Sequence, residues 1–285
     1  MISHPRRIAT SAVFGLLALW SCAAADDETP PAAASGRMAI ESTAPEASFR
    51  VEPRTIEIGT SVEGRPIVAT IHGHTGPSIL FMATIHGNEW AGTPLLERFE
   101  AEIVAAPGWT ESRRIVLIRV ANPDGFAMQR RTNSRGVDLN RNFPADNFTE
   151  SSRHGGTPLS EPESKALADF LAAEKPAAIL SIHQPLACID WDGEAEVLAR
   201  AMSAVSPLAA KKLGGRPGSL GSWAGLTLGI PIVTFEMRAG DEKLSAEALW
   251  RLHGPALLAF LSAVEHRGHG TNGEAGAAPE RSGGR

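Results

Sequence analysis

The stretch Ile79-Leu80-Phe81-Met82-Ala83-Thr84-Ile85, followed directly by His86-Gly87-Asn88-Glu89, joins an apolar run of strand length to a group of reactive side chains. Such a run is typical of a strand that is covered on both faces. Three similar runs, at 114–121, 177–182 and 231–235, alternate with helical patterns. This alternation predicts an α/β fold, with a single domain built on a mainly parallel, mixed, twisted sheet flanked by helices.

Turn and capping signals predict the other elements of the domain. Residues 54–71 are typical of a hairpin with its turn at Glu63-Gly64-Arg65-Pro66. Ser160 and Glu163 have the spacing of a capping box at the start of a helix. Helices are expected over residues 93–105, 160–174, 194–204 and 245–264.

The N-terminal residues have the composition of an export signal. Arg6 and Arg7 precede a short apolar stretch, and residues 23–25 are alanines, which predicts a cleaved signal peptide over residues 1–25. The sequence Leu19-Trp20-Ser21-Cys22 equally fits a lipoprotein signal with Cys22 acylated, so both alternatives stay open. Either one predicts an exported protein, periplasmic or held at the membrane only through a lipid anchor at Cys22.

Composition limits the remaining possibilities. Residues 26–48 are expected to be a disordered linker and 267–285 a disordered tail, which leaves 49–266 for the folded domain. The net charge is −5 and no basic stripe is present, so a nucleic-acid partner is not expected. Of the two cysteines, Cys188 lies in an apolar context and is interpreted as a packed side chain without a disulfide partner.

Reactive residues follow each of the four apolar runs. They are His86, Asn122-Pro123-Asp124-Gly125, His183 and Glu236. Ligands bind beyond the carboxyl ends of parallel strands, so we expect all four segments to meet at one edge of the sheet.

Two imidazoles and one carboxylate form a typical catalytic zinc site that leaves one coordination position open. His86, Glu89 and His183 supply this set, and an H-x-x-E pair is weak evidence without such a third partner. Zinc lowers the pKa of a bound water toward about 7, and Glu236 is placed to act as the base. Three further histidines are interpreted as solvated loop residues: His72, His74 and His154.

The segment 130–144 is rich in cationic and amide side chains. Within it, Asn140 and Arg141 can hold a substrate carboxylate in fork geometry, whereas the alternative is a solvated basic loop.

The motifs Asn122-Pro123-Asp124-Gly125-Phe126, Gly136-Val137-Asp138-Leu139-Asn140-Arg141-Asn142-Phe143 and His86-x-x-Glu89 resemble those of the zinc carboxypeptidase family, the M14 peptidases. The resemblance covers roughly residues 55–260. Within that family the chain is similar to the murein peptide amidases, through residues 160–163, 183–189 and 217–223. Those enzymes cleave the γ-D-glutamyl–meso-diaminopimelate bond of cell-wall peptides, which implies a murein peptide as the substrate here.

The resemblance also implies roles for individual residues. It makes His86, Glu89 and His183 the ligands of one zinc ion and Glu236 the general base. It implies that Arg131 polarises the scissile carbonyl. Asn140 and Arg141 would hold the C-terminal carboxylate of the substrate. Ser219 and Trp223 would lie in a wall that binds the peptide; the alternative for this segment is a tight turn without a binding role.

The chain departs from the amidase pattern at two places. Gln184 replaces an acidic residue, and Met237-Arg238 replaces a proline-containing run. Arg238 either pairs with the α-carboxylate of D-Glu or is simply exposed. The chain has no tyrosine, which favours the amidase branch over the digestive carboxypeptidases. The alternatives are a general carboxypeptidase acting on ordinary peptides and a non-catalytic cell-wall peptide binder, which would need no general base.

Overall fold

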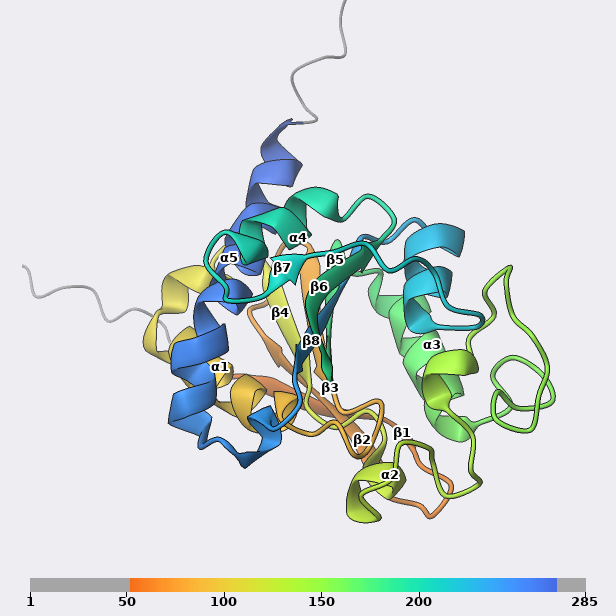
Figure 1. Ribbon diagram of the computed structural model, residues 1–285. Helices are drawn as coiled ribbons and strands as arrows, with labels where there is room; N and C mark the ends of the chain where they lie inside the picture. Colours follow the sequence, from red (N-terminus) through yellow and green to blue (C-terminus); the bar gives the residue numbers. More distant parts are fainter. Residues whose placement is uncertain (1–51, 271–285) are drawn as a thin grey trace, which may run out of the picture. The chain divides into compact units, whose positions relative to one another are not determined.

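A mixed sheet of eight strands forms the centre of the fold, in the order β1-β2-β4-β3-β5-β8-β6-β7 (Figure 1). The computed structural model describes residues 52–270, with side chains described through residue 264. The strands are β1 (Arg54–Thr60), β2 (Pro66–His72), β3 (Ser78–Ala83), β4 (Arg114–Ile118), β5 (Ala178–His183), β6 (Leu186–Asp192), β7 (Ala209–Ala210) and β8 (Ile232–Arg238).

The four central strands, β4, β3, β5 and β8, run parallel to one another. The hairpin β1–β2 joins antiparallel at one side, and β6 pairs antiparallel with β8 at the other. The expected α/β fold with a mainly parallel, mixed sheet is therefore confirmed.

Helices cover both faces of the sheet. The α-helices are α1 (Gly92–Ala105), α2 (Pro123–Ala127), α3 (Pro162–Glu174), α4 (Glu196–Ser203) and α5 (Ala246–Gly270). Short 3₁₀ turns are η1 (Pro107–Thr110), η2 (Leu139–Arg141) and η4 (Asp241–Lys243), and η3 (Gly221–Thr227) is a π-helix. In Figure 1, α1, α4 and α5 lie on one side of the sheet and α3 on the other.

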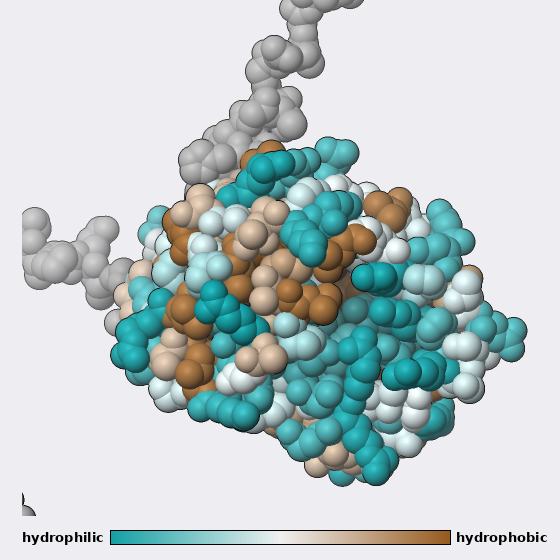
Figure 2. All heavy atoms as spheres, viewed as in Figure 1, coloured by the Kyte–Doolittle hydropathy of each residue, from teal (hydrophilic) through white to brown (hydrophobic). Residues whose placement is uncertain are grey.

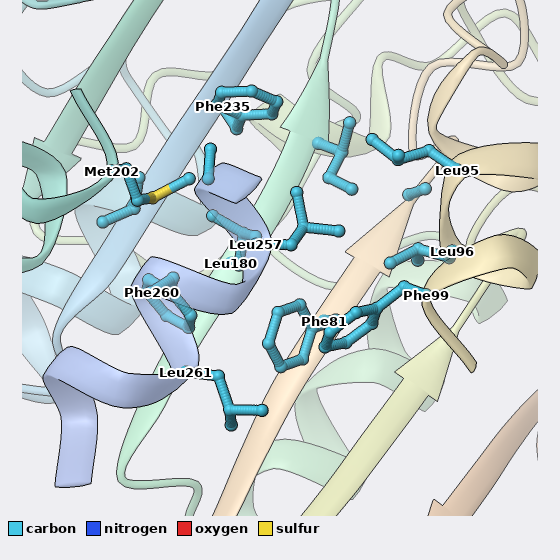
Figure 3. Packing of buried hydrophobic residues seen from close by; sticks show 14 of the residues in the cluster. Phe81, Leu95, Leu96, Phe99, Leu180, Met202, Phe235, Leu257, Phe260 and Leu261 are labelled. Carbon is cyan, nitrogen blue, oxygen red and sulfur yellow. The ribbon is translucent and has the colours of Figure 1, made fainter. Parts of the chain in front are cut away.

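Alternation along β3 divides the core into two layers. Phe81 faces α1, α4 and α5, whereas Leu80 and Met82 face α3 and η3. Figure 3 shows Phe81 packed between Phe99 of α1 and Phe260 of α5, with ring centroids 4.6 Å and 5.5 Å away. Burying one such ring contributes about 1.5–3 kcal/mol, so these contacts hold the central strands in place.

The hydropathy of the surface differs between the two sides of the sheet. Figure 2 shows hydrophilic residues gathered over the side that carries α2 and α3, and more apolar residues over the side of α1 and α5. Within residues 52–270, no helix combines the length and apolarity that a membrane span requires.

Two expectations about individual residues were wrong. The capping box does not form: Ser160 donates to the Glu161 side chain, and Glu163 instead accepts from the backbone N–H of Val62 at 3.2 Å. His72 is not a solvated loop residue, since it lies buried in β2 with Nε2 2.9 Å from Glu100 Oε1.

The C-terminal helix extends past the expected end of the domain. Helix α5 runs through Gly270, past the expected limit at 266. The expected signal peptide (1–25), the linker (26–48) and residues 271–285 of the tail lie outside the described residues. Strands β6 and β7 were not expected, because Asp190 and Asp192 interrupt the apolar pattern of β6.

Candidate metal centre

The carboxyl ends of β3, β5 and β8 bring the predicted ligands and base together. His86 and Glu89 follow β3, while His183 ends β5 and lies opposite Glu236 of β8 in the parallel register. These four side chains are buried and all line one cavity of about 280 Å³. The expectation that they meet at one edge of the sheet is confirmed.

Three donor atoms in this cavity form a nearly equilateral triangle. Nδ1 of His86 lies 2.9 Å from Glu89 Oε2, Nδ1 of His183 lies 3.0 Å from the same oxygen, and the two imidazole nitrogens are 3.2 Å apart. Ligands held about 2.0–2.1 Å from a tetrahedral zinc ion lie roughly 3.3 Å from one another. The donor set and its spacing therefore fit zinc, with a fourth position left for solvent or substrate.

A tight turn places His86 and Glu89 on the same side of the chain. The two residues precede α1, which begins only at Gly92, and the turn is closed by a 3.0 Å hydrogen bond from Glu89 N to His86 O. Gly87 has a specific reason to be glycine, because a Cβ there would overlap the carbonyl carbon of Gly125. The two loops thus contact each other through their backbones.

Asp138 orients the first ligand. His86 Nε2 donates to Asp138 Oδ1 at 3.0 Å, which leaves Nδ1 to face Glu89 and His183. The same carboxylate also accepts from Arg131 Nε at 2.9 Å and from the backbone of Asn140 at 3.1 Å. A carboxylate behind a metal-binding imidazole fixes its ring orientation and raises its basicity.

These contacts decide the charges of the centre. Burial alone would lower the pKa of His86, but hydrogen bonds to Asp138 and Glu89 raise it. Burial opposes ionisation of Glu89, yet its hydrogen bonds with His183 and His86 hold its pKa well below the usual range. The pKa of Asp138 is likewise depressed, despite burial, by its contact with His86. Ionised carboxylates are the form in which such groups bind metals.

Arg131 and Glu236 both line the cavity. Arg131 Nη1 donates to Glu89 Oε1 at 2.8 Å, so the guanidinium is held beside the ligand carboxylate. Glu236 Oε2 accepts from the backbone N–H of Leu186 at 3.3 Å. The Glu236 carboxylate therefore lies in the cavity as a possible proton acceptor, and it forms no ion pair with the described residues.

Of the four predicted substrate-binding residues, three line the cavity: Asn140, Arg141 and Ser219. The loop that carries Ser219 is fixed to this segment, since Leu220 N donates to Asn140 Oδ1 at 2.9 Å. Trp223 is placed differently from the expectation. Its ring stacks on Phe143 with centroids 5.5 Å apart, inside the core and not on the cavity wall.

The segment after β4 does not reach the cavity. Asn122 caps α2 by accepting from Gly125 N at 2.8 Å. Asp124 is fully buried and accepts hydrogen bonds from Ser61 at 2.6 Å and from Ser134 at 3.2 Å. The segment does meet the His86 loop at this edge, since Asn122 Nδ2 donates to Ile85 O and Gly125 lies against Gly87. Its polar residues, however, anchor the hairpin turn and do not line the cavity.

Gln184 and Arg238 also differ in their placement. Gln184 accepts from Ala91 N at 3.1 Å and donates to Glu242 Oε2 at 2.9 Å, so it joins the segments around His183. Arg238 is exposed and donates to Pro207 O at 3.3 Å, outside the cavity, which agrees with the exposed alternative.

Sequence reasoning gave no role to four residues in or beside the cavity. Asp138 lay within a quoted motif without a role, and its contact with His86 spans 52 positions. Asp190 and Asp192 of β6 line the cavity, as does Arg216. The only available signal was the polar alternation of the sequence Leu186-Ala187-Cys188-Ile189-Asp190-Trp191-Asp192.

Comparisons with known proteins agree with this geometry. Residues 41–194 match the family model described as zinc carboxypeptidase. Murein peptide amidase A of Escherichia coli K12 is 34% identical over 212 residues, covering 67% of this chain and 84% of that protein. The crystal structure of the murein-tripeptide amidase from Escherichia coli O157 aligns with a TM-score of 0.57 at 28% identity, over 73% and 92% of the two chains. Bovine thrombin-activatable fibrinolysis inhibitor, at 23% identity, covers 75% of this chain and 90% of its own with a TM-score of 0.65, and so shares the fold.

Proposed function

The chain belongs to the zinc carboxypeptidase family, and we propose that it is an exported murein peptide amidase that cleaves the γ-D-glutamyl–meso-diaminopimelate bond. The family and its relatives make the chain a peptide hydrolase, which removes a non-catalytic wall binder from consideration. One observation carries the proposal: a zinc-type donor triangle, the carboxylate of Glu236 and an Asn–Arg pair share one cavity.

Each of these groups has a part in amide hydrolysis. His86, Glu89 and His183 would hold the zinc ion, with Asp138 fixing the first imidazole. When bound, zinc acts as a Lewis acid that polarises a carbonyl and acidifies water. Glu236 accepts the proton of the attacking water and passes it to the departing nitrogen.

The arginines of the cavity position the substrate. Asn140 and Arg141 hold the free carboxylate of the C-terminal residue, which predicts cleavage next to a chain end. Arg131 donates toward the scissile carbonyl, where negative charge develops. Donors of this kind typically stabilise the transition state by about 3–4 kcal/mol.

The substrate class is supported by the relatives. A protein named murein peptide amidase A and a solved murein-tripeptide amidase both align over most of their length. The sequence contains no tyrosine, so the tyrosine that serves in digestive carboxypeptidases has no counterpart here, which favours the amidase. A substrate in the cell wall also agrees with the export that the N-terminal sequence predicts.

The test is product release from defined peptides. Purified protein is incubated with L-Ala-γ-D-Glu-meso-diaminopimelate and, separately, with blocked dipeptides that end in ordinary L-residues. We expect diaminopimelate from the first substrate only, loss of activity after chelation and recovery with added Zn²⁺. Cleavage of only the blocked dipeptides would make the protein a general carboxypeptidase.

A further inference from the structure

The acidic part of the cavity takes no part in the proposed hydrolysis. On β6, the side chains of Cys188, Asp190 and Asp192 share a face, because alternate strand residues point the same way. In the ladder with β8, Cys188 lies opposite Glu236 and Asp190 lies opposite Thr234. The face thus leads from the proposed base into an acidic part of the cavity.

The two aspartates are buried, yet they are not equivalent. Asp192 forms an ion pair with Lys212 at 3.2 Å, and the absence of a side chain at Gly221 leaves room for its carboxylate. Asp190 has no cationic partner within the described residues. Its Oδ1 accepts from Leu213 N at 2.8 Å, which leaves Oδ2 available to a ligand. A buried carboxylate without a counterion favours the binding of a cation.

A cationic group lines the same cavity. Arg216 is exposed, lines the cavity and has no hydrogen-bond partner for its guanidinium among the described residues. Burial lowers the pKa of Arg141, and repulsion from the nearby charge of Arg216 lowers it further. Arg141 is assigned to the C-terminal carboxylate, so Arg216 offers a second cationic group to a further carboxylate of the same residue.

Together these groups match a side chain that ends in both an ammonium and a carboxylate. We propose that Asp190 and Arg216 form a subsite for such a zwitterionic head on the C-terminal residue of the substrate. The proposal rests on the proposed function and names the residues that give it specificity. It predicts a diamino diacid in preference to an ordinary amino acid.

The dimensions agree with this assignment. Two residues along a strand span about 6.8 Å, which separates Asp190 from the level of Glu236. The carbon that bears the second amino group in diaminopimelate is four C–C bonds from the first, roughly 5 Å when extended. An ammonium on that carbon therefore reaches Asp190 while the scissile amide lies beside Glu236.

A matched series of peptides tests each half of the subsite. The peptides are L-Ala-γ-D-Glu-X, where X is meso-diaminopimelate, L-lysine (which lacks the second carboxylate), L-2-aminopimelate (which lacks the second ammonium) or L-norleucine (which lacks both). For the zinc-loaded wild-type protein, we expect kcat/KM to fall about ten- to a hundredfold on loss of either charged group.

Two variants then assign the charges to residues. Asp190→Asn, which keeps an acceptor for Leu213 N, should abolish the preference for diaminopimelate over aminopimelate. Arg216→Gln should abolish the preference for diaminopimelate over lysine. Asp169→Asn and Arg200→Gln, at exposed positions on α3 and α4, serve as controls and should leave both ratios unchanged.

The outcomes separate this subsite from the proposed function. Equal cleavage of all four peptides by the wild type, or unchanged ratios in both cavity variants, would overturn the subsite while leaving the peptidase intact. Cleavage of none of the four would instead remove the murein peptide function itself. Circular dichroism of the variants shows whether each one is folded.

Discussion

His86 Nε2 donates a 3.0 Å hydrogen bond to Asp138 Oδ1, so a residue within the 136–143 motif sets the orientation of a ligand from the loop after β3. Loss of such a carboxylate typically lowers metal affinity about ten- to a hundredfold. We expect Asp138→Asn to weaken zinc binding by that factor, measured by competition with a fluorescent chelator. Asp146→Asn, at an exposed position nearby in sequence, is the control and should bind zinc like the wild type. Equal affinities for the two variants would show that Asp138 does not support the ligand.

Glu236 is predicted to serve in proton transfer and not in metal binding. It lies in the cavity but outside the donor triangle of His86, Glu89 and His183. Glu236→Gln should therefore retain one zinc ion per chain by elemental analysis, with kcat reduced about 10²- to 10⁴-fold. His183→Asn is the complementary variant and should lose the metal together with activity. Turnover near the wild-type rate in Glu236→Gln would assign the base elsewhere.

The sequence predicted those parts of the fold that depend on continuous burial. Strands β3, β4, β5 and β8 are covered on both faces, so their apolar runs were plain. Strand β6 was missed because one of its faces carries aspartates into the cavity. Its register depends on pairing with β8, which lies 40 or more positions away, and no local pattern reports such pairing.

The sequence indicated which residue types form the site, but not which distant residues each of them contacts. His86, Glu89 and His183 were identified because few other side chains bind zinc in that combination. By the same reasoning Asp124 looked reactive, yet four donors from distant segments satisfy its carboxylate. Trp223 looked like part of a binding wall, whereas stacking on Phe143 places it in the core. Contacts between distant segments decided both cases.

A buried histidine should make stability depend on pH. His253 is fully buried, its Nε2 donates to Asp241 Oδ2 at 2.8 Å, and its Nδ1 has no partner among the described residues. Burial lowers the pKa of His253, and the contact with Asp241 offsets this only in part. The unfolded chain, in which histidine titrates near ~6.5, therefore binds a proton at a pH where the folded chain does not.

Protonation of His253 therefore favours the unfolded chain. The free energy of unfolding is greatest above about pH 6.5 and falls as the pH drops toward the depressed folded-state pKa. We expect urea denaturation to show a larger loss between pH 7.5 and 5 for the wild type than for His253→Gln. The comparison cancels effects shared by both proteins, such as protonation of the metal ligands. Parallel pH profiles would contradict the prediction.

The loop contact at Gly87 should tolerate no side chain. A Cβ at Gly87 would overlap the backbone of Gly125, which cannot move without displacing the hairpin anchor at Asp124. Gly87→Ala should lower the free energy of unfolding by about 1–3 kcal/mol or more, and should also weaken zinc binding through displacement of His86. Gly156→Ala is the matched control, because a Cβ there meets nothing within 4 Å. Thermal unfolding of both variants, with and without zinc, measures the difference.

Gln184 should resist conversion to the acidic residue expected in amidase relatives. Its amide group accepts from Ala91 N and donates to Glu242 Oε2 and Arg238 O, so both ends of the amide are used. Gln184→Glu places a second carboxylate against Glu242 and removes both donated bonds, which should cost about 1–3 kcal/mol of stability. The double variant Gln184→Glu with Glu242→Gln restores a donor–acceptor pair and should recover part of that loss. The exposed substitution Gln129→Glu is the control for adding one negative charge. If Gln184→Glu is as stable as the wild type at pH 7.5, Gln184 does not hold these segments together.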